Sequence, residues 1–237
     1  MGPIQFKIWR VIENLFPRMI HSKTKIDMLK YLGVDVGEGT ALFNAGSITF
    51  DTTRPLLLKI GKYCKITEGT VILTHDYSRS VIRRKYGEVI GEAKPTVIGD
   101  NVFIGINSII LMGTEIGSNC IVGAGSVCSG KYPDNSVICG NPARVLCSID
   151  DHYIKRKNRY VDEAKYYAKL YKERLGRFPT IKEMDAFFPI YLERSSDALI
   201  KSGVRTNLSG DIEAEVIDAF LHSKGQYNSY QEFLEDC

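Results

Sequence analysis

The chain of 237 residues is 44% hydrophobic and 25% charged, the composition of an ordinary globular protein with room for one or two domains. A formal net charge of +3 is too small to indicate nucleic-acid binding by itself. Without a signal sequence or a run of about 18 apolar residues, the chain is expected to be cytoplasmic. Its six cysteines show no C-x-x-C spacing, so neither a metal site nor a redox pair is predicted.

Residues 1–35 are predicted to form a helical cap. Apolar residues recur at helical spacing over residues 4–16 and 23–32, and Pro17 separates the two runs. The repeat that follows would otherwise begin with an unpaired strand edge. We therefore expect these helices to cover its first coil.

Residues 36–147 carry a hexapeptide repeat, which is clearest over residues 98–133. The first column of six-residue units reads Ile98, Ile104, Ile110, Ile116, Val122 and Cys128. Glycine stands second at 99, 105, 117 and 123, and the fifth column is small or β-branched until Tyr132. The same register appears upstream at Val36, Leu42, Ile48, Ile60, Ile66 and Ile72, with a break at Arg54-Pro55.

This period predicts a parallel β-helix. Each unit supplies a short strand and a corner, and three units complete a triangular coil of about 18 residues. Aliphatic side chains fill the interior, small residues fit behind them, and glycine is expected to relieve restrictive corner dihedrals. A sandwich of short strands is the alternative, and a strict period of six argues against it.

An excursion interrupts the repeat at residues 76–95, because the 26 residues from Ile72 to Ile98 are not a multiple of six. His75 stands at its start, as the one histidine of four that lies in the β-helix. An imidazole at such a corner suits a general base. The other interpretation is a surface histidine in a polar turn, and its position at the excursion favours the catalytic one.

Residues 148–237 are predicted to form a helical region, with helices over 150–175, from Thr180, and over 211–223 and 229–236. Thr180 and Glu183 have the spacing of a capping box. The first helix is rich in Lys, Arg and Tyr. It could lie on an anionic membrane surface, but a packed helix with a solvated basic face is the favoured interpretation.

These motifs together resemble the hexapeptide acetyltransferases, most closely the maltose, galactoside and capsular-polysaccharide O-acetyltransferase branch. The resemblance rests on Thr74-His75, the excursion, and the segments at 98–105, 122–127 and 140–145. It implies a left-handed β-helix, a homotrimer with active sites between subunits, and acetyl-CoA as co-substrate. Because the family often has Trp where Phe103 stands, the resemblance does not define the shape of the acceptor pocket.

The resemblance also implies roles for single residues. His75 would be the catalytic base and the backbone N–H of Ile106 the oxyanion donor. The coenzyme groove would hold Gly105, Ala124, Ser129 and Arg144, the last facing a coenzyme phosphate. Gly105 and Ala124 could equally serve corner geometry alone.

Four residues are candidates for acceptor binding. Asn44 resembles a sugar-hydroxyl contact of the family. Within the excursion, Tyr77 could stack on a sugar ring, and Arg83 and Arg84 could hold a phosphate. A solvated loop would explain the same arginines.

The predicted function is acetyl-CoA-dependent O-acetylation of a sugar or polysaccharide precursor. An N-acetyltransferase acting on an amino sugar or an antibiotic shares the fold, donor and base. A γ-type carbonic anhydrase would need three zinc histidines, whereas the β-helix has only His75. The non-enzymatic alternative is a trimeric scaffold, which would not require a base at the excursion.

Overall fold

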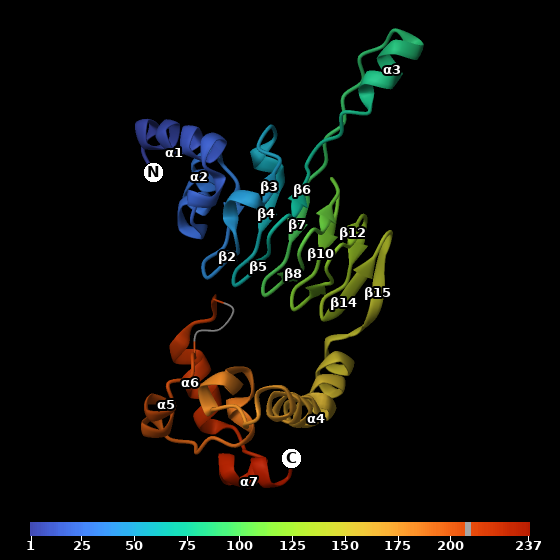
Figure 1. Ribbon diagram of the computed structural model, residues 1–237. Coiled ribbons are helices and arrows are strands. Elements are labelled where there is room, and N and C mark those ends of the chain that lie inside the picture. The colour runs from blue at the N-terminus through green and yellow to red at the C-terminus, as the bar shows by residue number, and fades with distance from the viewer. Residues whose placement is uncertain (207–209) are drawn as a thin grey trace. The chain divides into compact units, whose positions relative to one another are not determined.

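The computed structural model describes residues 1–206 and 210–237, and the chain divides into two compact units, Met1–His152 and Tyr153–Cys237 (Figure 1). The first unit contains the β-helix and the second is helical. The helices hold more residues than the strands. The expectation of a mainly β protein is therefore wrong for the chain as a whole, because every strand is short whereas the second unit and the N-terminus are helical.

The first unit begins with helices and continues as short strands. Its helices are α1 (Pro3–Leu15), η1 (Pro17–Met19), α2 (Ser22–Leu32), η2 (Ala45–Ser47), η3 (Pro55–Leu57) and α3 (Arg79–Tyr86). Its strands are β1 (Asp35–Val36), β2 (Ala41–Leu42), β3 (Thr49–Phe50), β4 (Leu58–Ile60), β5 (Lys65–Ile66), β6 (Val71–Ile72), β7 (Thr96–Ile98), β8 (Phe103–Ile104), β9 (Ile109–Ile110), β10 (Glu115–Ile116), β11 (Ile121–Val122), β12 (Val127–Cys128), β13 (Lys131–Tyr132), β14 (Ser136–Gly140) and β15 (Ala143–Ser148).

The strands wind into stacked coils. Every third strand joins the same sheet, in the orders β1-β4-β7-β10-β13, β2-β5-β8-β11-β14 and β3-β6-β9-β12, and all of these pairings are parallel. One turn of the chain therefore visits three faces, as the hexapeptide period predicts. Figure 1 shows the coils side by side, with α1 and α2 at the end where the first coil lies. Trp9, Ile12 and Ile26 of these helices pack against the core.

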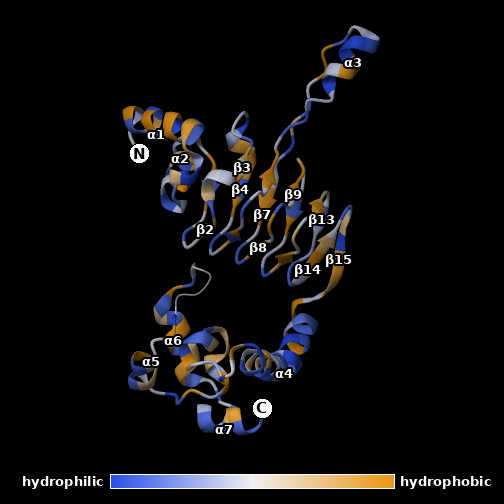
Figure 2. Cartoon of the chain, in the orientation of Figure 1, coloured by the Kyte–Doolittle hydropathy of each residue, from blue (hydrophilic) through white to orange (hydrophobic). Residues whose placement is uncertain are grey.

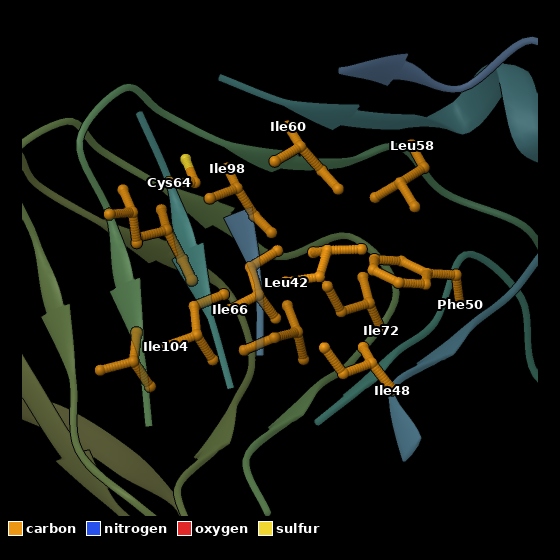
Figure 3. Packing of buried hydrophobic residues seen from close by; sticks show 14 of the residues in the cluster. Leu42, Ile48, Phe50, Leu58, Ile60, Cys64, Ile66, Ile72, Ile98 and Ile104 are labelled. Carbon is orange, nitrogen blue, oxygen red and sulfur yellow. The ribbon is translucent and has the colours of Figure 1, made fainter. Parts of the chain in front are cut away.

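The interior of the coils is filled by the first column of the repeat. Ile66, Ile72, Ile98, Ile104 and Ile110 are fully buried, and Figure 3 shows several of them converging with their neighbours. Burying such a side chain contributes about 1.5–3 kcal/mol. The aliphatic column thus supplies the core that the pattern indicated.

The fifth column is buried as well, and its hydroxyl groups are satisfied locally. Thr70, Ser108, Thr114 and Ser126 each donate to the carbonyl oxygen three residues earlier, at 2.6–2.8 Å. A buried hydroxyl without a partner would be costly. The hydrogen bond explains why small polar residues are tolerated in this column.

The corners differ from the expectation in one respect. Second-column glycines are needed for the close approach of the next coil rather than for unusual dihedrals: a Cβ on Gly105 would lie 2.5 Å from the backbone nitrogen of Ala124. The left-handed corner positions are instead divided between asparagines, which adopt positive φ more readily than most L-residues, and glycines outside the second column, such as Gly39 and Gly69. Asn101, Asn119 and Asn135 also form a side-chain ladder, with Nδ2 to Oδ1 distances of 3.0 and 3.2 Å.

The excursion leaves the coils as a projecting arm (Figure 1). His75 and Ala93 form an isolated antiparallel bridge at its base, and the Lys94 N–H donates to the Thr74 carbonyl at 3.1 Å. The arm ends in α3, a helix that the sequence interpretation did not assign. At the last coil, β15 turns back antiparallel on β14, a hairpin that the repeat pattern also did not predict.

The second unit is built from α4 (Ile149–Leu175), η4 (Ile181–Ile190), α5 (Ser196–Ser202), α6 (Glu213–His222) and α7 (Tyr230–Glu235). Its core centres on Tyr191 and Phe233, and the predicted capping box at Thr180 and Glu183 is present. Figure 2 shows apolar residues along the coil strands, whereas α4 is largely hydrophilic. Within the two described ranges, no helix is both long and apolar enough to cross a membrane.

Candidate active site

His75 meets an aspartate from the preceding coil. His75 follows β6 and Asp51 follows β3, and these strands pair with Phe50 opposite Ile72. Both residues therefore leave the coil at the same corner. The Nδ1 atom of His75 contacts Oδ2 of Asp51, and the two side chains are only 10% and 3% exposed.

The Asp51 carboxylate is held by a dense set of donors. Oδ1 accepts from the Thr53 N–H at 3.0 Å and from the Thr53 hydroxyl at 2.6 Å. Oδ2 accepts from the Thr74 N–H at 3.0 Å and from the Thr74 hydroxyl at 2.6 Å. Burial by itself raises the pKa of this carboxyl, but the hydrogen bonds from Thr53, Thr74 and His75 outweigh it and hold the pKa well below its ordinary range.

This contact fixes the imidazole. Because Nδ1 faces Asp51, with the Thr53 hydroxyl 3.1 Å away, Nε2 is the ring nitrogen left for chemistry. The ring of Tyr77 packs edge-on against His75 with the centroids 4.4 Å apart. An anionic, buried carboxylate at Nδ1 favours the tautomer with the proton on Nδ1 and stabilises the imidazolium that forms when Nε2 accepts a proton.

Sequence interpretation did not identify Asp51 or Thr53. Both lie just before Arg54-Pro55, where the hexapeptide pattern breaks. Their positions in the repeat therefore did not indicate which residues of the next coil they contact. A usable signal was present, however. Asp51 directly follows a core strand residue, a position where a carboxylate is rare without a partner.

The proposed oxyanion donor and the groove residues lie on the later coils. Ile106 is 44% exposed, and within the described ranges its backbone N–H has no hydrogen-bond partner. Gly105 and Ala124 touch across successive coils, so the corner-geometry explanation holds for their contact. Ile106 precedes β9 whereas His75 follows β6, and these strands pair. The two groups are therefore separated by the width of one face of the coil.

Ser129 and Arg144 come together at the last coil. The Ser129 N–H donates to the Tyr132 hydroxyl at 3.1 Å, and that hydroxyl donates to the Ala143 carbonyl at 3.3 Å. Arg144 donates to the same carbonyl at 2.8 Å. Both Ser129 and Arg144 are otherwise exposed.

The acceptor candidates are divided between two places. Tyr77 and Arg83 line a depression of about 200 Å³ in the arm, together with Arg79 at the start of α3. Arg84 lines a second depression on α3, which shares Ser80 and Arg83 with the first. Asn44 is instead hydrogen-bonded to Glu68 at 3.0 Å, on a different corner of the coil from His75.

A metal centre has no support from the described side chains. Within residues 1–206 and 210–237, no group of three or more His, Cys, Asp or Glu could hold a metal ion. The six cysteines are free thiols.

Comparisons with known proteins identify the family of the chain. A family model described as "Hexapeptide repeat of succinyl-transferase" matches residues 95–128. Protein CapG of Staphylococcus aureus is 39% identical over 159 residues, which are 67% of this chain and 89% of CapG. Galactoside O-acetyltransferase of Escherichia coli K12 is 42% identical over 73 residues, 30% of this chain and 35% of that protein.

Among solved structures, a maltose O-acetyltransferase from Clostridium difficile 630 is 25% identical, with a TM-score of 0.41, and covers 62% of this chain and 89% of that one. The relation to CapG extends over most of that protein, and the hexapeptide match falls on the later coils. The resemblance inferred from the sequence is thereby confirmed, and the chain belongs to the hexapeptide-repeat acetyltransferase family of acyltransferases.

Proposed function

We propose that the protein transfers an acetyl group from acetyl-CoA to a hydroxyl of a sugar or polysaccharide precursor, with His75 as general base. The observation that carries this proposal is the contact between Asp51 and Nδ1 of His75. It leaves Nε2 as a proton acceptor at a corner that also bears the excursion. A histidine with a solvated surface role would not need a buried carboxylate behind it.

The chemistry follows from that arrangement. Nε2 of His75 takes the hydroxyl proton while the acceptor oxygen attacks the thioester carbonyl carbon. The C–S bond then breaks, and the departing CoA thiolate is protonated by the imidazolium. Asp51 stays ionised throughout and holds the ring in place. The Ile106 N–H stabilises the negative charge that develops on the carbonyl oxygen.

The coenzyme would lie along the later coils. Gly105 and Ala124 would line the path of its pantetheine arm, and Arg144, which is exposed, would offer a charged group to a phosphate. Ser129 lies beside Arg144 at the same end of the β-helix. No metal is required, since the attacking hydroxyl is activated by the imidazole.

We also propose that the coils are left-handed and that the active protein is a homotrimer in the cytoplasm. The separation of His75 from Ile106 by one face of the coil supports an assembly. A neighbouring subunit could bring its own Ile106 corner to this His75. The site would then be complete only between two subunits.

A sugar hydroxyl is the acceptor best matched by the arm. Tyr77 presents an exposed ring beside His75, and aromatic rings pack well against the apolar faces of sugars. Arg83 adds positive charge at the same depression, and Arg84 adds more along α3. Asn44 is the weakest of the proposed contacts, because its amide is already engaged by Glu68.

An N-acetyltransferase acting on an amino sugar is the second candidate. It is favoured by the 39% identity over 69 residues to 2,3,4,5-tetrahydropyridine-2,6-dicarboxylate N-acetyltransferase of Clostridium perfringens. That match covers only 29% of either protein, and His75 would serve an ammonium acceptor equally well. The acceptor atom therefore has to be decided by experiment.

The test measures free thiol released from acetyl-CoA in the presence of matched pairs of sugars and 2-amino sugars. O-acetyltransfer predicts release with the sugar and an ester product that mild alkali cleaves. An alkali-stable amide would support the N-acetyl candidate instead. If the His75→Ala variant released thiol as fast as the wild type, both the O-acetyl and the N-acetyl candidate with His75 as base would be contradicted.

A further inference from the structure

The second unit contains a cavity of about 290 Å³ that lies outside the acetyl-transfer site. It is bounded by the first half of α4, the end of η4 and the segment after α6. Its apolar wall includes Tyr153, Tyr160 and Ile190. This size is close to the lower end of ordinary small-molecule pockets, about 300 Å³.

The charged groups around this cavity are all positive. Arg156, Lys157, Arg194 and Lys224 line it, and among the residues that the structure describes no Asp or Glu does. Arg156 is neutralised by Glu163, with both guanidinium nitrogens 2.7–2.8 Å from the carboxylate oxygens. Within the ranges that the structure describes, the other three have no carboxylate partner. The cavity therefore holds an uncompensated positive charge.

Arg194 is the most constrained of these cations. Its terminal nitrogens donate to the carbonyls of Leu192 and Pro189, and its Cζ lies 4.7 Å from the centre of the Phe220 ring. Its Nε is buried and has no hydrogen-bond partner among the described residues. Burial lowers the pKa of this guanidinium. A buried charge without a counter-charge is costly, and a bound anion would offset that cost.

The ring-bearing wall limits the kind of anion. Inorganic phosphate would use the cations but would leave the exposed ring of Tyr153 without a partner, whereas Tyr160 already packs against Phe187. Tyr153 is 60% exposed, so its ring is free to stack on a flat partner, and Lys157 lies 5.6 Å from the same ring. A ligand with a single carboxylate would not balance the three uncompensated cations, so a ligand with more negative charge fits better.

We propose that this cavity binds a nucleoside diphosphate, or a compound built on one, with the base against the tyrosines and the diphosphate among Lys157, Arg194 and Lys224. Aromatic rings supply stacking for a base, and clustered Lys and Arg recognise phosphates. The proposal does not depend on the acetyl-transfer mechanism, because the two sites share no residue. Nucleotide binding would account for the basic and tyrosine-rich sequence at the start of α4.

The experiment is calorimetric titration of the full chain with UDP, uridine and inorganic pyrophosphate. UDP should bind saturably, with a Kd of roughly 10 μM to 1 mM. Uridine and pyrophosphate should each bind at least about tenfold more weakly, since each offers only half of the interaction.

Charge reversal separates this cavity from general attraction to a basic surface. The double variant Lys157→Glu/Lys224→Glu should weaken UDP binding by at least about tenfold. Lys155→Glu is the matched control: it lies on the same helix and is exposed, but it does not line the cavity. It should keep the wild-type affinity within about threefold. Circular dichroism checks that both variants remain folded.

Several results would overturn the proposal. UDP that fails to bind at about 5 mM would show that the cavity is not a nucleotide site. Pyrophosphate binding as tightly as UDP would reduce it to a simple anion site without a role for the tyrosines. Binding to phosphatidylglycerol vesicles through Lys157 and Lys224, without UDP binding, would assign the surface to a membrane instead.

Discussion

Replacing Asp51 by asparagine tests the central contact of the proposed active site with minimal change in volume. Asparagine can keep the two hydrogen bonds from Thr53 by placing its oxygen where Oδ1 stands. Its NH₂ group then faces the Thr74 N–H and Nδ1 of His75, which are themselves donors. The Thr74 hydroxyl can rotate away, but its backbone N–H cannot.

The expected magnitudes follow from these lost contacts. A buried N–H left without an acceptor costs about 1–3 kcal/mol, and a lost hydrogen bond to a charged group costs about 1.5–3 kcal/mol. We therefore expect the free energy of unfolding to fall by about 2–4 kcal/mol at neutral pH. Loss of the charge-assisted bond to His75, at 1.36 kcal/mol per factor of ten, should lower kcat by about 10–150-fold.

The measurements are turnover and urea unfolding from pH 3 to pH 8. The folded state lowers the pKa of Asp51, so its stabilisation is fully present above the unfolded pKa of about 4 and is lost as the pH falls toward the folded pKa. The difference between wild type and Asp51→Asn should therefore be constant above about pH 5 and shrink below about pH 4.

Asp76→Asn is the matched control. Asp76 is the residue after His75 and is exposed, and its carboxylate accepts one bond, from the Ser78 N–H at 2.6 Å. It should change stability by less than about 1 kcal/mol and leave turnover nearly unchanged. If Asp51→Asn behaved like Asp76→Asn in both assays, the positioning role of Asp51 would be refuted.

Other predictions follow from the same structure. His75→Ala should lower turnover by roughly 10²–10⁴-fold and leave the assembly intact; near-normal turnover would exclude His75 as the base. Replacing residues 79–92 by a short Gly/Ser linker should raise the acceptor KM and leave CoA affinity within about threefold by calorimetry; a collapse of that affinity would assign the arm to the donor site. A chain ending at His152 should still bind CoA, and complete loss of binding in a folded protein would show that the helical unit completes the groove. Gly105→Ala should lower the free energy of unfolding by about 2–4 kcal/mol, because its Cβ would meet backbone at 2.5 Å. Gly2→Ala, with open space around the added Cβ, is the control in thermal unfolding. Equal melting temperatures of the two variants would contradict the argument that Gly105 is needed for the close approach of the next coil.

The amino-acid pattern predicted the β-helix, its interruption and the place of His75 at that interruption. These follow from a local period, because each six-residue unit repeats the same strand, corner and core position. Where the coils are regular, the pattern also predicted the register: Phe103 lies opposite Ile121, three units later. The pattern further indicated where the coils end, near residues 140–145.

Which residues meet at the corner of His75 is visible only in the folded chain. Upstream, η2 and η3 insert extra residues, so Thr49 pairs with Val71 and Asp35 with Lys59, and neither offset is three units. The expected column member Ile48 is replaced in the strand by Phe50. Because the inserted turns change the length of the early coils, periodicity could not place Asp51 against His75. That contact joins residues 24 positions apart, and it follows from the pairing of β3 with β6, which sets Phe50 opposite Ile72.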